Sequence, residues 1–159
     1  MNAKLTSLFA VMGLGLMIAS AGAGTTASIT VTVTVPSVIS VSVNTGTWAA
    51  GNLALGGTTE TSSQFTATND GNVSEDFAVQ CGYSANWTCG AAAGNEVFAM
   101  NAKGEALTNW TGIGTSQTLQ TNVAKDASAS FDLQLTAPTA TVNVDAEQTM
   151  TVMLTASKH

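Results

Sequence analysis

The sequence is poor in charge. Only 9% of its 159 residues are charged, no arginine occurs, and four basic residues face ten acidic ones, for a net charge of −6. Nucleic-acid binding needs clustered basic side chains, so this composition argues against such partners. Histidine is also scarce: the sequence has one, His159, which is its last residue. A nucleophilic Ser or Thr needs a base beside it, so we expect no catalytic residues, no enzymatic activity and no cofactor.

No apolar run is long enough for a membrane-spanning helix. Lys4 is followed by an apolar stretch of roughly 15 residues, whereas a spanning helix needs about 20. Small residues end the stretch, and both Ala19–Ala21 and Ala21–Ala23 fit an A-x-A cleavage site. This arrangement is typical of a secretory signal peptide. We therefore expect residues 1–23 to be removed, leaving an exported chain, residues 24–159, at the cell surface or outside the cell without a membrane contact. A retained membrane anchor is the alternative.

Cysteine is limited to one pair, Cys81 and Cys89, separated by Gly82–Thr88. In an exported protein such a pair forms a disulfide by default. A metal site is a weak alternative, because two thiolates without a nearby histidine lack the four ligands that zinc prefers. The sequence therefore predicts a Cys81–Cys89 disulfide and no metal.

Alternation with a period of two begins directly after the leader. Apolar β-branched residues alternate with Ser and Thr, and the apolar set is Ile29, Val31, Val33 and Val35. This pattern predicts a strand with one apolar and one polar face. Pro36 interrupts the alternation, which resumes at Ile39–Val43, so we expect an N-terminal strand segment over residues 28–43.

Similar short segments recur to the end of the chain. Further strands are predicted at Leu53–Leu55, Ser63–Thr68, Phe77–Cys81, Glu96–Asn101, Thr118–Val123, Ser128–Thr136 and Gln148–Ala156. The loops Gly82–Gly94 and Lys103–Gly114 are expected to be the least ordered. About seven to nine strands without a helix predict an all-β fold, an antiparallel β-sandwich of immunoglobulin-like or jelly-roll type, over residues 24–159.

The first strand carries the most specific functional hypothesis. Exposed strand edges normally carry charged residues that prevent pairing with other chains. Here no charged residue occurs between Lys4 and Glu60. Such a segment can add itself to the sheet of a neighbouring copy, as a donor strand. The hypothesis makes Ile29, Val31, Val33 and Val35 the inserted side chains and a homopolymer the partner, and a low-charge surface suits close packing of copies. The alternative is an ordinary first strand of a monomeric domain.

Three aromatic residues could instead form a ligand-stacking surface. Tyr83 and Trp87 lie between the two cysteines, and Trp110 lies in a predicted loop. Flat rings stack on sugars, so a monomeric adhesion or carbohydrate-binding module that recognises surface glycans is the second hypothesis. The alternative is that the rings fill the ends of the core.

The acidic residues indicate less. Asn69–Asp76 supplies several oxygen ligands of the kind that calcium takes, but the spacing is not that of a calcium loop, and Asn-Asp-Gly-Asn between two strands is typical of a turn. Glu75 and Asp76 are adjacent, so on a strand they point to opposite faces, which does not suit a two-carboxylate glycosidase. An enzyme acting through carboxylates from distant parts of the chain stays open.

Several short motifs carry a family resemblance. They are Leu55-Gly56-Gly57-Thr58, Phe65, Asn69-Asp70-Gly71 and Phe131–Pro138. With them the chain resembles bacterial and archaeal immunoglobulin-like surface modules, and more loosely the TasA/camelysin subunits of biofilm-matrix fibres and archaeal bundling pili. The resemblance implies polymerisation by donor-strand exchange and no catalysis. The chain departs from TasA subunits in its shorter length and in its cysteine pair. We therefore expect a secreted structural subunit of an extracellular filament or surface layer.

Overall fold

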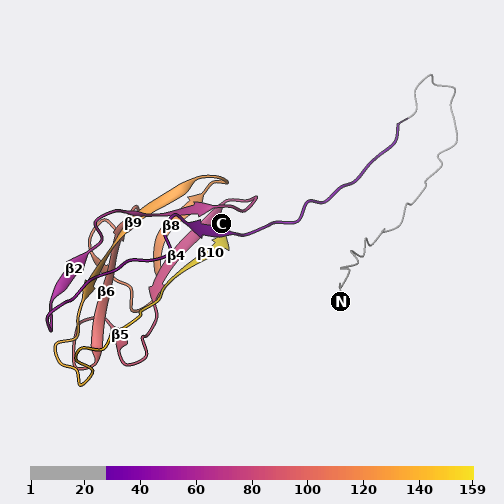
Figure 1. Ribbon diagram of the computed structural model, residues 1–159. Helices are drawn as coiled ribbons and strands as arrows, with labels where there is room; N and C mark the ends of the chain where they lie inside the picture. Colours follow the sequence, from indigo (N-terminus) through magenta and orange to yellow (C-terminus); the bar gives the residue numbers. More distant parts are fainter. Residues whose placement is uncertain (1–27) are drawn as a thin grey trace, which may run out of the picture. The chain divides into compact units, whose positions relative to one another are not determined.

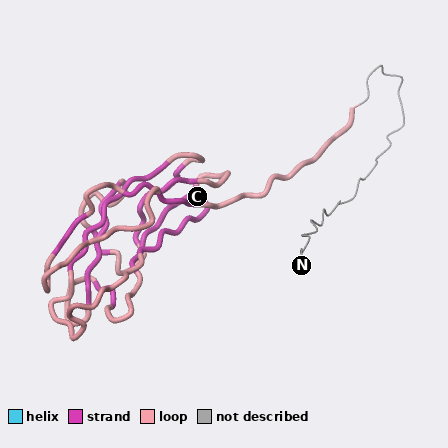
Figure 2. Tube along the Cα trace, in the orientation of Figure 1, coloured by secondary structure: helices cyan, strands magenta, loops and turns pink. Residues whose placement is uncertain are grey.

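Strands account for all the regular secondary structure in the computed structural model, which describes residues 28–159 (Figure 2). The chain divides into two units, Met1–Thr34 and Val35–His159, and every strand belongs to the second unit. No helix occurs among residues 28–159, so none there could cross a membrane. The predicted signal peptide, residues 1–23, lies outside the described residues. The strands are β1 (Val41–Val43), β2 (Thr58–Glu60), β3 (Phe65–Asn69), β4 (Glu75–Cys81), β5 (Thr88–Gly90), β6 (Val97–Gly104), β7 (Thr111–Gly112), β8 (Gln117–Val123), β9 (Ser128–Thr136) and β10 (Val152–Lys158).

The strands form two sheets (Figure 1). The larger sheet has the order β1-β3-β9-β6-β5, with β2 also paired to β9 and β7 paired to β6, and the smaller sheet has the order β10-β4-β8. The predicted all-β sandwich is confirmed. One pair departs from the expected antiparallel arrangement: β5 and β6 are parallel, and the connection between them ends in a turn where the N–H of Gly94 bonds to the carbonyl of Val97.

Alternation along the central strands builds the core between the sheets. In β4 every second side chain is buried, and Phe77 and Val79 have no exposed surface. Strand β9 matches its predicted bounds and buries Phe131, Leu133 and Leu135 in the same way. The predicted alternation therefore identified the central strands and their buried faces correctly.

Several segments after Val43 differ from the sequence-based prediction, and the closing strand begins at Val152 instead of Gln148. Leu53–Leu55 is a loop and not a strand, because a tight turn begins inside it: the carbonyl of Ala54 accepts the N–H of Gly57 at 2.8 Å, and Gly56 adopts a positive φ of 68°. The two loops expected to be least ordered contain β5 and β7. The second of them also buries Leu107 and Ile113 against the core.

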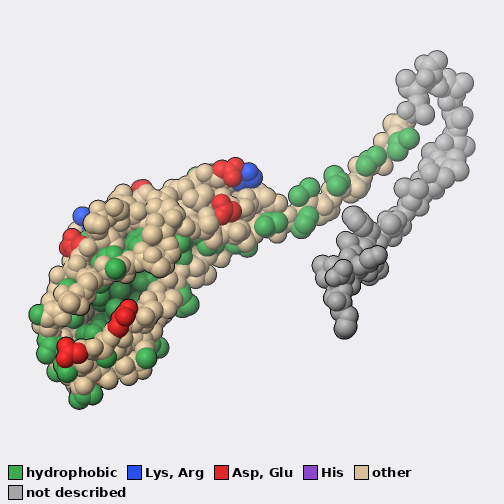
Figure 3. Space-filling model, in the orientation of Figure 1, with side chains coloured by type: hydrophobic (Ala, Val, Ile, Leu, Met, Phe, Trp, Pro, Cys, Tyr) green, Lys and Arg blue, Asp and Glu red, His purple; other side chains and the backbone are tan. Residues whose placement is uncertain are grey.

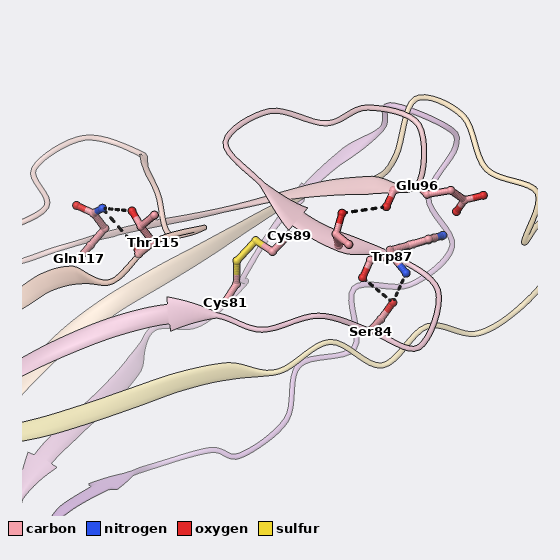
Figure 4. Close-up of a disulfide and its surroundings, with 8 residues drawn as sticks. Cys81, Ser84, Trp87, Cys89, Glu96, Thr115 and Gln117 are labelled. Carbon is pink, nitrogen blue, oxygen red and sulfur yellow. Dashed lines mark hydrogen bonds between the residues drawn. A yellow bond between two sulfur atoms is a disulfide. The ribbon is translucent and has the colours of Figure 1, made fainter.

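The predicted disulfide is confirmed, and it joins the two sheets (Figure 4). Cys81 ends β4 in the smaller sheet, and Cys89 lies in β5 of the larger sheet. The loop between them is held by Ser84, whose hydroxyl oxygen accepts the backbone N–H of Trp87 at 2.9 Å. The disulfide therefore closes one end of the sandwich.

Removing the disulfide should destabilise the domain without changing its fold. Closure of so short a loop contributes about 2.5 kcal/mol through the entropy of the unfolded chain, so the double variant Cys81→Ala, Cys89→Ala should lose about that free energy of unfolding in urea titrations. A reducing agent should lower the stability of the parent protein and leave the double variant unchanged. Equal stability of the parent with and without reductant would contradict this role.

Candidate assembly site

Residues 28–40 form no strand, in contrast to the predicted segment over 28–43, of which only Val41–Val43 is a strand (Figure 2). A strand persists only when a neighbouring strand pairs with its backbone, so sequence alternation alone does not produce one. The apolar side chains of the segment are instead exposed, with exposed fractions of 91% for Ile29, 83% for Val31, 82% for Val33 and 76% for Val35. The residues chosen from the sequence as inserted side chains thus form an uncovered apolar row.

The residues that follow are fastened to the turn between β3 and β4. The carbonyl of Pro36 accepts a hydrogen bond from the side-chain amide of Asn72 at 3.0 Å. The N–H of Val38 donates to the Asn72 Oδ1 at 2.7 Å, and the N–H of Asn72 donates to the Val38 carbonyl at 3.0 Å. The N–H of Asp70 donates to the carbonyl of Ser40 at 2.9 Å. We call Pro36–Ser40 with these partners the N-terminal clasp.

A buried polar pair supports the clasp from below. Glu75 has no exposed surface, and its Oε1 accepts the N–H of Ser40 at 2.9 Å. Asn69, also fully buried, donates to the carbonyls of Val73 and Val123 at 2.8 Å each and accepts the N–H of Gly71 at 2.8 Å. A side chain at Gly71 would collide with the Glu75 Oε1, so only glycine fits there. The side-chain oxygens of Asn69 and Glu75, which the sequence offered as calcium ligands, thus accept backbone N–H groups of the chain itself. This agrees with the interpretation of Asn69–Asn72 as a turn between two strands.

One oxygen of this pair has no partner. The Oε2 of Glu75 is buried and makes no hydrogen bond within the described part of the chain. Burying a polar group without a partner costs free energy, so the clasp region stores a local penalty that its other bonds offset. Sequence reasoning did not find Glu75 as a supporting residue, because its polar character gives no sign that its side chain turns inward.

Two other carboxylates bind groups before and after the chain's last strand, Glu96 before it and Asp76 after it. Glu96, at a positive φ of 55°, accepts the N–H of Val142 at 2.7 Å and the hydroxyl of Thr141 at 2.7 Å. The bond from Val142 is the main reason that the pKa of Glu96 lies below its ordinary value. Asp76 accepts the N–H of Asn122 at 2.9 Å, which lowers the pKa of Asp76, and His159 adds a smaller contribution at 2.8 Å.

The two tryptophans proposed, with Tyr83, for ligand stacking lie far apart along β6. Trp87 precedes Thr88, which pairs with Val97, whereas Trp110 precedes Thr111, which pairs with Ala102. In this register Trp87 lies opposite residue 96, and Trp110 lies opposite residue 103. The two positions are seven residues apart along the β6 region, a distance of about 23 Å. The Trp87 ring packs against the core and donates to Thr141, whereas Tyr83 is 70% exposed.

The clasp can be tested through one side chain. Asn72→Ala removes the acceptor for the Val38 N–H, and the loss of one such bond, about 1 kcal/mol, should speed the exchange of that amide about fivefold. Asn72→Asp keeps an acceptor oxygen and should retain the protection of Val38. The amide of Val79, inside β4, should exchange at the parent rate in both variants, as measured by NMR. Unchanged exchange of Val38 in Asn72→Ala would contradict the clasp.

Known proteins give no further guide to the function of this chain. Comparisons with protein-family models, curated proteins and solved structures each find no match to this chain. The function must therefore be inferred from its own residues, and two features stand out: an uncovered apolar row and the clasp that fastens the residues after it.

Proposed function

We propose that this protein is exported and acts as a structural subunit of an extracellular filament or surface layer, in which each copy donates Ser28–Val35 to a neighbour. One observation carries the proposal: Ile29, Val31, Val33 and Val35 form a continuous β-branched row that is at least three-quarters exposed. Fully burying one such side chain contributes about 1.5–3 kcal/mol, so an uncovered row of four strongly favours a partner that covers it.

The clasp supports donation to another copy over folding back. Its bonds reach from the carbonyl of Pro36 to Ser40, so a chain that keeps them cannot reverse its direction within these residues. A reversal would then have to fall before Pro36, within or directly beside the apolar row itself. Pairing in trans needs no reversal at all.

The surface chemistry of the domain agrees with close packing of many copies. Charged residues make up 9% of the sequence, and the outer face of the larger sheet is lined by hydroxyl pairs such as Thr68 with Ser128 at 2.9 Å and Thr58 with Thr136 at 3.0 Å. Weakly charged surfaces repel each other little, even though the net charge is −6. The disulfide suits an oxidising, extracellular location.

The proposal predicts that assembly depends on the apolar row and not on the polar face of the same segment. In Val31→Asp with Val33→Asp, filaments should be lost, because two carboxylates would have to be buried in the neighbour. The matched variant Thr30→Asp with Thr32→Asp places the same charges on the solvent face and should still assemble. Electron microscopy and light scattering of the purified proteins measure the difference, and mass spectrometry should find an N-terminus at Gly24.

The matched pair also separates assembly from folding. All four positions lie in the unit Met1–Thr34, outside the β-sandwich, so at a concentration at which the parent is monomeric both variants should unfold in urea at the parent midpoint. A parent protein that stays monomeric at every concentration, or a Val31, Val33 variant that assembles like the parent, would contradict the proposed function.

A further inference from the structure

The smaller sheet ends in a strand with an unpaired edge. Strand β10 pairs with β4 alone, through residues from Val152 to Lys158. Every second side chain of β10 packs against the core but is only partly buried. Together with the preceding Met150, these side chains form the row Met150, Val152, Leu154 and Ala156. The equivalent residues of β4, the next strand in the sheet, are buried. The core beneath β10 is therefore incompletely covered.

A second segment with unpaired backbone borders the same region. Residues 44–57 run from β1 to β2 without strand structure, and in the described part of the chain residues 45–53 make no backbone hydrogen bond. Three of their side chains, those of Trp48, Ala50 and Leu53, are also partly buried against the core. Unpaired backbone groups beside an apolar surface are an arrangement that a further strand can complete.

A hollow lined by hydrophobic side chains lies between these two segments (Figure 3). We call it the β10 groove; its margins are residues 44–57 and β10. Neither the segment 44–57 nor residues 148–157 contain a charged residue, although an Asp or Glu side chain lies at the lower rim of the hollow in Figure 3. An apolar strand that enters the hollow would therefore desolvate few charged groups.

The other side of the sandwich is closed. There the segment from β6 to β8 crosses between the sheets: the N–H of Ala106 bonds to the Leu119 carbonyl, and the N–H of Ile113 bonds to the Met100 carbonyl. The same segment buries Leu107 and Ile113. The edge of β8, the second edge of the smaller sheet, is thus partly occupied by the chain itself, which leaves the β10 groove as the side where a strand is lacking.

The geometry points to the β10 groove as the acceptor site for Ile29–Val35 of a second copy, an inference that rests on the proposed function. The donor run Ile29–Val35 matches β10, Val152–Lys158, residue for residue in length. Its apolar residues alternate with the same period as the partly buried residues on β10, and it is free of charge. On insertion it would pair with the free edge of β10 and cover the core, adding a fourth strand to the three-stranded sheet.

Cysteine cross-linking in the full chain tests the assignment. Donor position Thr32 faces away from the apolar row, so Thr32→Cys is combined in turn with Thr151→Cys, Met153→Cys and Thr155→Cys, all exposed positions in or directly before β10. Directly opposed residues of paired antiparallel strands bring their Cα atoms to about 4.5–5.5 Å, within the range that a disulfide spans. Under mild oxidation at least one pair should convert most of the protein into a ladder of covalent oligomers on a non-reducing gel.

A matched pair on the other edge serves as the control. Thr32→Cys with Thr118→Cys, an exposed position in β8, should give no ladder. Peptide mapping must show Cys81 still joined to Cys89, and the thiol introduced by Thr32→Cys joined to β10 of another chain. Mixing isotope-labelled with unlabelled protein distinguishes that bond from one within a single chain.

Each other outcome has a definite meaning. If the parent assembles but only the Thr118 pair, or no pair, cross-links, the acceptor assignment is overturned and the proposed function stands. If the parent does not assemble, the proposed function itself fails, and the acceptor assignment fails with it. Cross-links within single chains would show that the segment fills its own groove, which overturns both.

Discussion

Every strand must pair its backbone with a neighbour and cover its apolar face. At two places in this molecule both requirements are unmet. Ile29–Val35 carries an apolar row without a sheet, and the β10 groove has a sheet edge and a core surface without a strand. In both places the missing partner is an uncharged extended segment with alternate apolar residues. The two deficits are complementary, so the proposed association between copies would remove both, and its repetition would give a polymer.

The remaining structure holds each of those two features in shape. The disulfide and the crossing segment with Ile113 hold the two sheets together. The clasp at Asn72 fastens the residues that directly follow the apolar row, and Glu75 and Gly71 set its geometry. Because the proposed association is between molecules, the stability gained from covering the row would rise with protein concentration, unlike the stability of the core.

Sequence alone predicted the parts of the fold that depend on local alternation. It placed β9 at its observed bounds, identified the buried face of β4 and paired Cys81 with Cys89. It could not predict that Ser28–Val35 lacks a partner strand, because alternation specifies a face and not a neighbour. It also missed the clasp and the groove: the inward turn of Glu75 and the unpaired backbone of residues 45–53 arise from tertiary packing, which leaves no pattern in the sequence.

Hydrogen exchange measured over a range of protein concentrations tests the central claim most directly. At low concentration the amides of Ile29–Val35 should exchange as in an unstructured chain, and at high concentration they should become protected together with the outward-facing amides of β10. Protection that is complete at every concentration would mean that the segment pairs within its own molecule. Fast exchange of Ile29–Val35 within assembled material would mean that the copies associate by another surface.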